Sequence, residues 1–306
     1  MSQKAQLIVE GRKLSVSNLD KVLYPKVGFT KGQVIDYYIR IAPVLLPHLR
    51  DRPLTMKRYP DGVDAEFFYE KNCPSHRPSW VRTAKIWSEG NQRIMDYCLA
   101  NDLPTLVWAA NLADLELHTS LSRKQDVARP TMMVFDLDPG PPADIVQCCQ
   151  VGLWLRDSLG EIKLKSWAKT SGSKGLQVYV PLNTAGVTYD DTKGLSRALA
   201  EHLEHEHVDL VVSKMLKSLR AAKVLVDWSQ NDEHKTTVCV YSLRARDEPT
   251  VSTPVTWDEV ENCLRKKRTD LLKFRSDQIL ARVEKMGDIF AQVEKLKQKL
   301  PKTWKL

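Results

Sequence analysis

Three aspartates at the ends of two apolar segments are the residues in this chain best suited to chemistry. TMMVFDLDPG ends in Asp136 and Asp138, and KVLVDW carries Asp227. Because side chains alternate along a strand, Asp136 and Asp138 should share one face about 7 Å apart, while Phe135 and Leu137 enter the core. Carboxylates so close repel each other unless a hard cation such as Mg²⁺ or Mn²⁺ neutralises them. Three aspartates on two strands would suffice to bridge two divalent ions for phosphoryl transfer.

Other readings of the aspartate pair remain open. Asp is common where a strand enters a turn, and Pro139 and Gly140 follow directly. An apolar strand ending in D-x-D also begins the haloacid-dehalogenase-type phosphatases, in which the first aspartate, here Asp136, is a nucleophile. Against that alternative, Pro139 stands where those enzymes usually have Thr or Val, and the pair lies at mid-chain. A non-catalytic DNA-end binding subunit is the third possibility, although it gives no reason for three inward-pointing aspartates.

A small-residue loop between the two aspartate segments could bind phosphate. Ser171 to Gly175 (SGSKG) combines hydroxyls, closely approachable backbone N–H groups and the charge of Lys174, although it is not a Walker A motif. An ordinary turn explains the same letters. Four further polar residues surround the segment after Asp227, and arginine among them offers a bidentate fork for phosphate. They are Gln230, Lys235, Arg244 and Arg246.

Strands mixed with helices predict an α+β fold with largely antiparallel sheet. Two helix starts carry capping boxes, at Thr30 with Gln33 and at Thr256 with Glu259. KVLVDW and TTVCVYSL, separated by SQNDEHK, predict a hairpin. The expected strands are 7–16, the segment PLTMKRYP, 131–138, 163–168 and 175–181, and the expected helices are 31–49, 103–117 ending near His118, 142–159, 189–206 and three short ones at the end.

Composition indicates a folded globular enzyme, and its basic excess favours a polyanionic partner, although a merely basic soluble enzyme has the same charge. Lys and Arg number 46 against 38 Asp and Glu, a net charge of +8. We expect a single two-lobed domain over 1–300 followed by a short basic tail, 301–306. The amino terminus lacks the apolar core of a signal peptide and no apolar run is long enough for a bilayer, so we expect a cytoplasmic, nucleoid-associated protein. The six cysteines show no C-x-x-C spacing and are expected to be free buried thiols.

The motifs taken together resemble the polymerase domain of the bacterial end-joining ligase D, in the archaeo-eukaryotic primase superfamily. The likeness covers nearly the whole chain. The matching segments are NLDKVLYP, FTKGQVIDYY, RPLTMKRYPDGVD, FFYEK, LELH, VFDLDPG, TSGSKGL, KSLRAAKVLVDWSQN, YSLRAR and VSTPVTWDE. The resemblance implies a primase-polymerase-like fold and a DNA-directed nucleotidyltransferase that fills gaps and extends ends in non-homologous end joining, with a preference for ribonucleotides and two Mn²⁺ or Mg²⁺ ions.

The same resemblance implies roles for individual residues. Asp136, Asp138 and Asp227 would bind the metal ions, and Lys21 and Lys31 would recognise a 5′-phosphate at the downstream side of a DNA gap. A pair of phenylalanines would supply the stacking platform for a template base, although the alternative is core packing, and one of the two is expected to pack inward. The implied nucleotide-binding set is His118, Ser171, Lys174, Gln177, Gln230 and Arg244, and the implied DNA-binding set is Lys21, Lys31, Lys57, Arg58, Phe67, Phe68 and Arg220.

One position departs from the resemblance. Family loops usually read SGSKGLH, whereas Gln177 occupies the place of that histidine. Glutamine donates a hydrogen bond but never carries charge, which places the contact with the nucleotide phosphates and its pH dependence in question. No ligase or nuclease motif accompanies the domain, so the resemblance implies a stand-alone subunit working beside a separate ligase and a Ku-like end-binding protein.

Overall fold

The computed structural model describes residues 4–301, so most of the predicted basic tail, 301–306, lies outside the described residues. The chain divides into two compact units, and each is described by itself. The first unit comprises Met1–Gln125, Thr236–Ser252 and Phe274–Asp288, and the second comprises Asp126–Lys235, Thr253–Lys273 and Ile289–Leu306. Among residues 4–301 there is no helix with the length and apolar character that crossing a membrane requires.

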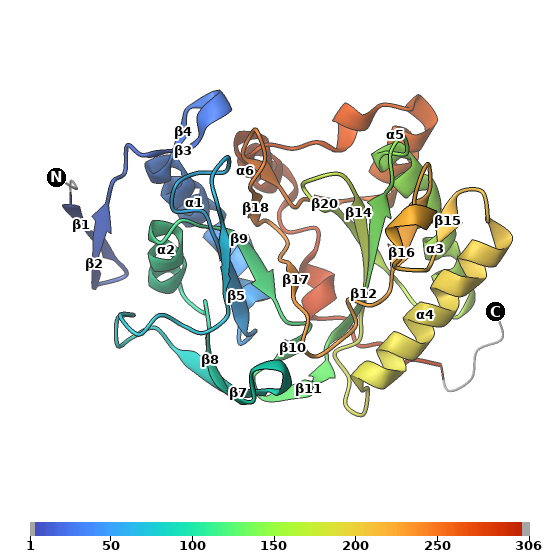
Figure 1. Cartoon of the computed structure of the whole chain (residues 1–306), viewed down its shortest axis with the longest axis horizontal. Helices are drawn as coiled ribbons and strands as arrows, with labels where there is room; N and C mark the ends of the chain where they lie inside the picture. Colours follow the sequence, from blue (N-terminus) through green and yellow to red (C-terminus); the bar gives the residue numbers. More distant parts are fainter. Residues whose placement is uncertain (1–3, 302–306) are drawn as a thin grey trace. The chain divides into compact units, whose positions relative to one another are not determined.

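The first unit is built on a six-stranded antiparallel sheet whose strand order is β17-β9-β5-β8-β7, with β6 pairing β5 (Figure 1). Helices α1 and α2 pack against each other beside it. The strands are β5 (Leu54–Arg58), β6 (Phe68–Glu70), β7 (Thr83–Ser88), β8 (Arg93–Cys98), β9 (Asp114–Thr119) and β17 (Thr237–Val238). The other elements are β1 (Lys4–Val9), β2 (Arg12–Ser17), β3 (Val22–Tyr24), β4 (Phe29–Thr30), α1 (Lys31–Leu49), α2 (Leu103–Asn111), β10 (Ser122–Arg123), β18 (Leu243–Arg244), β19 (Thr250–Val251) and α6 (Ser276–Met286).

The second unit holds another six-stranded sheet, in the order β15-β16-β12-β14-β13-β20 (Figure 1). Only β15 and β16 run parallel, so the prediction of a largely antiparallel α+β fold is confirmed. The strands are β12 (Met132–Pro139), β13 (Trp167–Thr170), β14 (Leu176–Pro181), β15 (Val211–Val212), β16 (Val224–Asp227) and β20 (Pro254–Val255). The other elements are β11 (Asp126–Pro130), α3 (Ile145–Glu161), α4 (Tyr189–Glu206) and α5 (Trp257–Lys266).

Side chains on one face of β12 and β14 are covered by α3. Phe135 and Leu137 are fully buried, as predicted. Gly152 of α3 lies so close to the sheet that a Cβ built there would meet Leu137 and Leu176 side-chain atoms at 3.5 and 2.9 Å. The odd-numbered positions of β12 therefore form the core, and the even-numbered aspartates face the other way.

Helix starts were the most accurately predicted boundaries. The Thr30 hydroxyl accepts a hydrogen bond from the Gln33 backbone at the start of α1, and Gln33 bonds back, as the capping box predicted. The same reciprocal pair, Thr256 with Glu259, begins α5. Helix α4 covers the predicted range 189–206.

Three predicted elements are wrong. The predicted strand 7–16 is interrupted by a turn at Glu10 and Gly11, so it forms the hairpin of β1 and β2. The predicted helix 103–117 ends at Asn111, and residues 114–119 form β9, which places His118 on a strand. The Ala113 backbone, at φ 57°, makes the break between the two. The predicted hairpin is also absent, because β16 pairs with β12 in the second unit whereas β17 pairs with β9 in the first.

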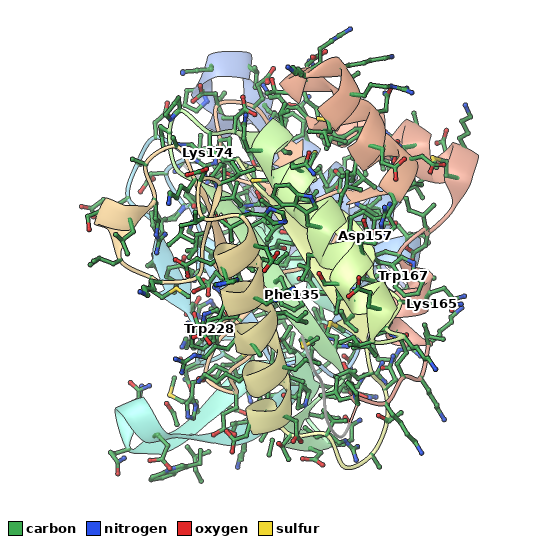
Figure 2. All side chains as sticks on the ribbon, turned by 90° about the vertical axis from the view of Figure 1, so that its right-hand side faces the viewer. Phe135, Asp157, Lys165, Trp167, Lys174 and Trp228 are labelled. Atoms are coloured by element: carbon green, nitrogen blue, oxygen red, sulfur yellow. A yellow bond between two sulfur atoms is a disulfide. The ribbon has the colours of Figure 1, made fainter. Side chains whose placement is uncertain are left out.

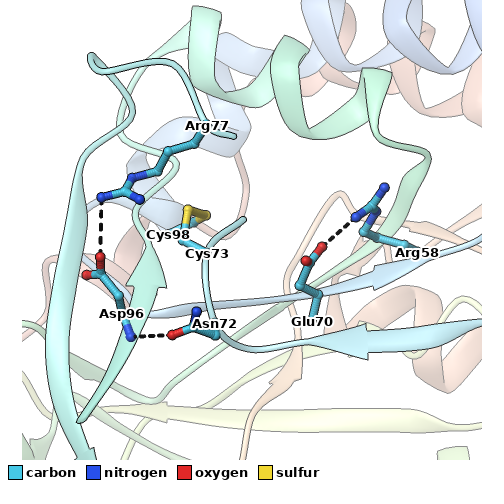
Figure 3. The surroundings of a disulfide bond; sticks show 7 residues. All are labelled: Arg58, Glu70, Asn72, Cys73, Arg77, Asp96 and Cys98. Atoms are coloured by element: carbon cyan, nitrogen blue, oxygen red, sulfur yellow. Dashed lines mark hydrogen bonds and ion pairs between the residues drawn. A yellow bond between two sulfur atoms is a disulfide. The ribbon is translucent and has the colours of Figure 1, made fainter. Parts of the chain in front are cut away.

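The prediction of free thiols fails for two of the six cysteines. Cys73 and Cys98 form a disulfide in the first unit (Figure 3). Asp96 lies on β8, the strand that ends at Cys98. Its backbone N–H donates to Asn72, and its carboxylate pairs with Arg77 at 3.3 Å. The other four are buried thiols outside any disulfide, as expected: Cys148, Cys149, Cys239 and Cys263.

The turn after Asp138 is fixed by a close backbone approach that only glycine permits. A Cβ on Gly140 would meet the Arg220 carbonyl oxygen at 1.8 Å, and the Gly140 N–H donates to the Lys223 carbonyl at 2.8 Å. The segment that leads into β16 is therefore attached to the turn at which β12 ends.

We predict that Gly140→Ala destabilises the protein by about 1–3 kcal/mol, because the methyl group forces the two backbones apart. Gly194→Ala is the matched control, since Gly194 lies within α4 with open space around its Cα and should gain up to about 1 kcal/mol. Urea denaturation measures both. Equal stability of the two variants would show that the close approach is not required.

Candidate active site

A row of polar side chains crosses the sheet of the second unit. The cross-strand register pairs Lys169 of β13 with Gln177 of β14, Gln177 with Asp136 of β12, and Asp136 with Asp227 of β16. Directly opposed residues project on the same face of a sheet, so the four side chains are neighbours. Asp138 lies two residues beyond Asp136 and shares that face. The three aspartates are thus brought together from two adjacent strands, as the sequence predicted.

Asp136 is the carboxylate in this row whose pKa is raised by its surroundings. Burial, with repulsion from Asp138 and Asp227, raises its pKa to about 7, although a hydrogen bond from Gln177 and the charge of Lys169 oppose the shift. The Oδ1 oxygen of Asp136 is buried and has no hydrogen-bond partner in the described structure. A buried carboxylate oxygen without a donor is costly, and a cation is the natural group to satisfy it.

Asp227 is held by neutral donors. Its Oδ1 accepts hydrogen bonds from the Ser229 N–H (2.8 Å) and hydroxyl (2.6 Å), and its Oδ2 accepts one from the Gln230 amide (3.0 Å). Lys235 donates in turn to the Ser229 hydroxyl at 2.6 Å. Asn231 attaches this turn to β12 by exchanging two hydrogen bonds with the Val134 backbone. Asp227 is therefore fixed without an Arg or Lys partner among residues 4–301, unlike an aspartate that serves only an ion pair.

The donor set fits divalent cations, although the complete ligand set is not preassembled. No group of three His, Cys, Asp or Glu side chains within residues 4–301 is already positioned around one ion. Asp227 contributes to this, because both its oxygens are engaged by Ser229 and Gln230. The unpartnered oxygen of Asp136 and the all-carboxylate chemistry nevertheless match the oxygen ligands that Mg²⁺ and Mn²⁺ prefer.

The SGSKG loop is organised by its first serine. The Ser171 hydroxyl accepts hydrogen bonds from the backbone N–H groups of Ser173 (3.2 Å) and Gly175 (3.1 Å). A Cβ on Gly175 would meet the Leu137 carbonyl oxygen at 2.1 Å, so the loop approaches β12 closely beside Asp138. Lys174 is exposed (Figure 2). The loop thus has the geometry of an ordered turn, and its lysine is presented to solvent.

In the first unit, the two lysines predicted to bind a 5′-phosphate are neighbours. The Lys31 N–H donates to the Lys21 carbonyl at 2.8 Å. The Lys31 ammonium is buried and donates to the Ser17 carbonyl at 2.7 Å. Burial, with the charges of Lys21 and Arg58, lowers the pKa of Lys31 to about 8. This cluster of positive charge, in which one lysine is easily deprotonated, favours an anion.

Glu116 lies among two cationic side chains and a histidine in the same unit. Its carboxylate lies 3.5 Å from the Lys57 ammonium, 3.0 Å from His118 Nε2 and 3.3 Å from Arg244 Nε. Burial raises the pKa of Glu116, but His118, Arg244 and Lys57 outweigh it and hold the pKa well below its usual value. Burial lowers the pKa of His118, while Glu116 opposes the shift. The structure therefore brings three predicted site residues together around a permanently ionised carboxylate.

Exposed aromatic rings lie next to the basic residues Lys57 and Arg58. The Lys57 ammonium is 4.2 Å from the ring centre of Phe67, and the Arg58 guanidinium is 5.0 Å from that of Phe68. Phe67 is 49% exposed and Phe68 44% exposed. The expectation that one of them packs into the core is therefore wrong. They lie just before and at the start of the short strand β6, where both rings remain available for stacking.

Arg220 lies in the second unit on the segment that packs against Gly140. Its guanidinium donates to the Met215 carbonyl, while its Nε is buried without a partner in the described structure. Arg220 thus lies beside the turn that follows Asp138, which is closer to the acidic row than the sequence indicated.

Lys169, Glu116 and Ser229 were missed by the sequence analysis. A single charged residue inside the apolar segment WAKT was the available signal for Lys169, because a buried lysine needs a partner. Glu116, two residues before His118, gave a similar signal, since charged or polar residues alternate with leucines in DLELHT. Nothing in the sequence distinguished Ser229 from an ordinary turn residue.

The largely antiparallel sheet with its three neighbouring aspartates agrees with the class of primase-polymerase domains that the comparisons give. The family model described as "LigD, primase-polymerase domain" matches residues 30–290. The chain is 40% identical over 284 residues to the multifunctional non-homologous end joining protein LigD of Mycolicibacterium smegmatis, covering 92% of this chain and 36% of that protein. It is 33% identical over 275 residues to the bifunctional protein LigD of Bacillus subtilis, covering 90% and 43%.

A solved structure agrees with the sequence relatives. The polymerase domain from Mycobacterium tuberculosis ligase D in complex with DNA superposes with a TM-score of 0.84 at 38% identity, covering 92% of this chain and 98% of that one. The chain therefore belongs to the LigD primase-polymerase domain family, and not to the dehalogenase-type phosphatases. It spans between about one third and one half of the length of the relatives named here.

The raised pKa of Asp136 predicts a pH-dependent stability in metal-free protein. Because the folded state holds its proton more tightly than the unfolded chain does, stability should fall as pH rises from 4 to 7, by at most about 1.4 kcal/mol per pH unit. Asp136→Asn lacks this penalty, so its advantage over the wild type should grow across that range. Urea denaturation at each pH measures the difference, and Mn²⁺ above pH 7 should remove it. Parallel wild-type and variant curves would contradict the repulsion.

Proposed function

We propose that the protein is a DNA-directed nucleotidyltransferase that fills gaps and extends ends during double-strand break repair, by transferring a nucleotide to a primer 3′-hydroxyl with release of pyrophosphate. The observation that carries the proposal is the direct pairing of Asp136 with Asp227, beside Asp138, on the sheet of a LigD-type domain. The relatives' names place them in non-homologous end joining, and the structural neighbour is a polymerase domain in complex with DNA.

Asp136, Asp138 and Asp227 would hold two divalent ions, Mn²⁺ or Mg²⁺. When bound, such ions lower the pKa of an attacking hydroxyl and neutralise the charge on the leaving phosphate. The chain's own contribution is to hold the carboxylates close together. Phe135 and Leu137 anchor the strand in the core, and Ser229 with Gln230 hold Asp227 in place.

The nucleotide would be bound by residues that surround the aspartates in sequence or share the family motif. Lys174 is exposed at the end of the sheet where β12 leaves it, which suits a triphosphate oxygen. The proposed set is His118, Ser171, Lys174, Gln177, Gln230 and Arg244. A preference for ribonucleotides over deoxynucleotides is part of the proposal, and parallel extension assays with both sugars test it.

DNA with a gap or a broken end would be recognised by its backbone charge and by stacking. Lys21 and Lys31 supply the cationic pair for a 5′-phosphate, and Phe67 with Phe68 present exposed rings for a template base. Lys57, Arg58 and Arg220 complete the proposed DNA-binding set. A Ku-like end-binding protein and a DNA ligase are the partners that end joining requires, and the nucleoid is where such a protein would act.

Replacing either aspartate of the central pair should abolish primer extension. We expect Asp136→Ala and Asp227→Ala to reduce extension of a labelled primer on gapped DNA by more than about a hundredfold, because the charge of the reacting phosphates is no longer neutralised. DNA binding should change little. Asp209→Ala removes an exposed carboxylate of the same unit and is the control. Full activity of both variants in Mn²⁺ and Mg²⁺, or hydrolysis of p-nitrophenyl phosphate by the wild type, would argue for another reaction.

The depressed pKa of Lys31 predicts that recognition of the 5′-phosphate weakens in alkaline solution. Lys31 is charged below its pKa of about 8 and neutral above it, so the preference for 5′-phosphorylated gapped DNA should fall by up to about tenfold per pH unit above 8. Fluorescence anisotropy with phosphorylated and unphosphorylated DNA measures the preference. Lys31→Met should lower it and flatten its pH dependence, whereas Lys13→Met, at an exposed site, should leave it unchanged. A preference constant to pH 9.5 would contradict the assignment.

A further inference from the structure

Lys169 is a lysine with no exposed surface inside the sheet that carries the aspartates. It lies on β13 between Pro254 of β20 and Gln177 of β14 in the cross-strand register. Its ammonium donates a hydrogen bond to the Gln177 carbonyl oxygen and lies 5.3 Å from the ring centre of Tyr179. Burying an ammonium costs several kcal/mol unless polar partners compensate, so a lysine here needs its neighbours.

The contact with Lys169 determines which way the Gln177 amide faces. A lysine ammonium has only donors, so Gln177 must present its oxygen to it. The NH₂ group is then the only donor that the side chain has left, and it reaches the Asp136 carboxylate. Rotating the amide by half a turn would place NH₂ against an ammonium and oxygen against a carboxylate, which repel on both sides. The three side chains therefore form a chain of hydrogen bonds with a single allowed direction.

We propose that Lys169 and Gln177 are a positioning pair for Asp136. Lys169 fixes the direction of the Gln177 amide, and the amide donates to one side of the Asp136 carboxylate. The Oδ1 oxygen of Asp136 accepts no hydrogen bond in the described structure, so it is available to a divalent cation. The inference rests on the proposed function, because it deepens the role of the same acidic row.

Binding of Mn²⁺ separates positioning from simple charge. If Lys169 acted only through its charge, it would repel the cation, and at a pH where Asp136 is fully ionised removing it would tighten binding. A positioning role predicts the opposite. We expect Lys169→Met to weaken Mn²⁺ binding by roughly tenfold, the usual effect of losing a residue that orients a metal ligand. Calorimetric titration of metal-free protein with MnCl₂ measures this.

Two further variants complete the experiment. Lys169→Met/Gln177→Met should bind Mn²⁺ no more than about threefold more weakly than Lys169→Met, because residues acting as one chain are not additive. Lys165→Met removes an exposed charge just before β13 (Figure 2) and should leave Mn²⁺ binding unchanged. Thermal unfolding without metal verifies that each variant is folded.

The outcomes separate this inference from the proposed function. Wild-type protein that extends primers, with a Lys169→Met variant that binds Mn²⁺ as tightly as wild type or more tightly, would overturn the positioning pair and leave the polymerase standing. An additive double variant would overturn it in the same way. Wild-type protein that neither binds Mn²⁺ nor extends primers would remove the proposed function itself.

Discussion

The repulsion between carboxylates on one face of a sheet is the constraint on which the second unit depends. Asp136 faces Asp227 directly and shares its face with Asp138, and this repulsion adds to burial in making Asp136 a weak acid. A metal-free protein bears that cost in its stability. The arrangement is tolerable because the opposite face of β12 is apolar and fully buried, so the strand cannot turn its aspartates outward without exposing its core.

In the first unit, positive side chains lie close together, and one buried carboxylate, Glu116, offsets their repulsion. Lys57 and Arg244 would repel each other if they converged without a counter-charge. Glu116 is buried among them and stays ionised, so it holds cations at a surface that also presents the exposed ring of Phe67. In the second unit, anions converge and require cations from solution. In the first, cations converge around a built-in anion and keep hydrogen-bonding capacity for an anionic ligand.

Local chemistry made part of this structure predictable. The alternation of apolar and acidic residues predicted the face of the sheet on which Asp136 lies. The capping residues Thr30 and Thr256 predicted two helix starts. Both signals lie within four residues of sequence. Pairing between distant segments was not predictable. The segment at 114–119 continued an apolar pattern that a helix would also show, and nothing local indicated that β16 and β17 join different sheets. The disulfide spans 25 residues in sequence, which spacing alone does not reveal.

The same limit explains why Gln177 could be noticed but not interpreted from the sequence. The departure from the family loop is visible in the letters SGSKGLQ, whereas its partner lies eight residues earlier and is brought opposite only by antiparallel register. Once Lys169 is its neighbour, the Gln177 amide has a single favourable direction, because its two ends differ in hydrogen-bonding sense and cannot exchange without repulsion on both sides. A substitution at an active site is thus understood through the residue that orients it, and that residue is set by the fold rather than by the motif.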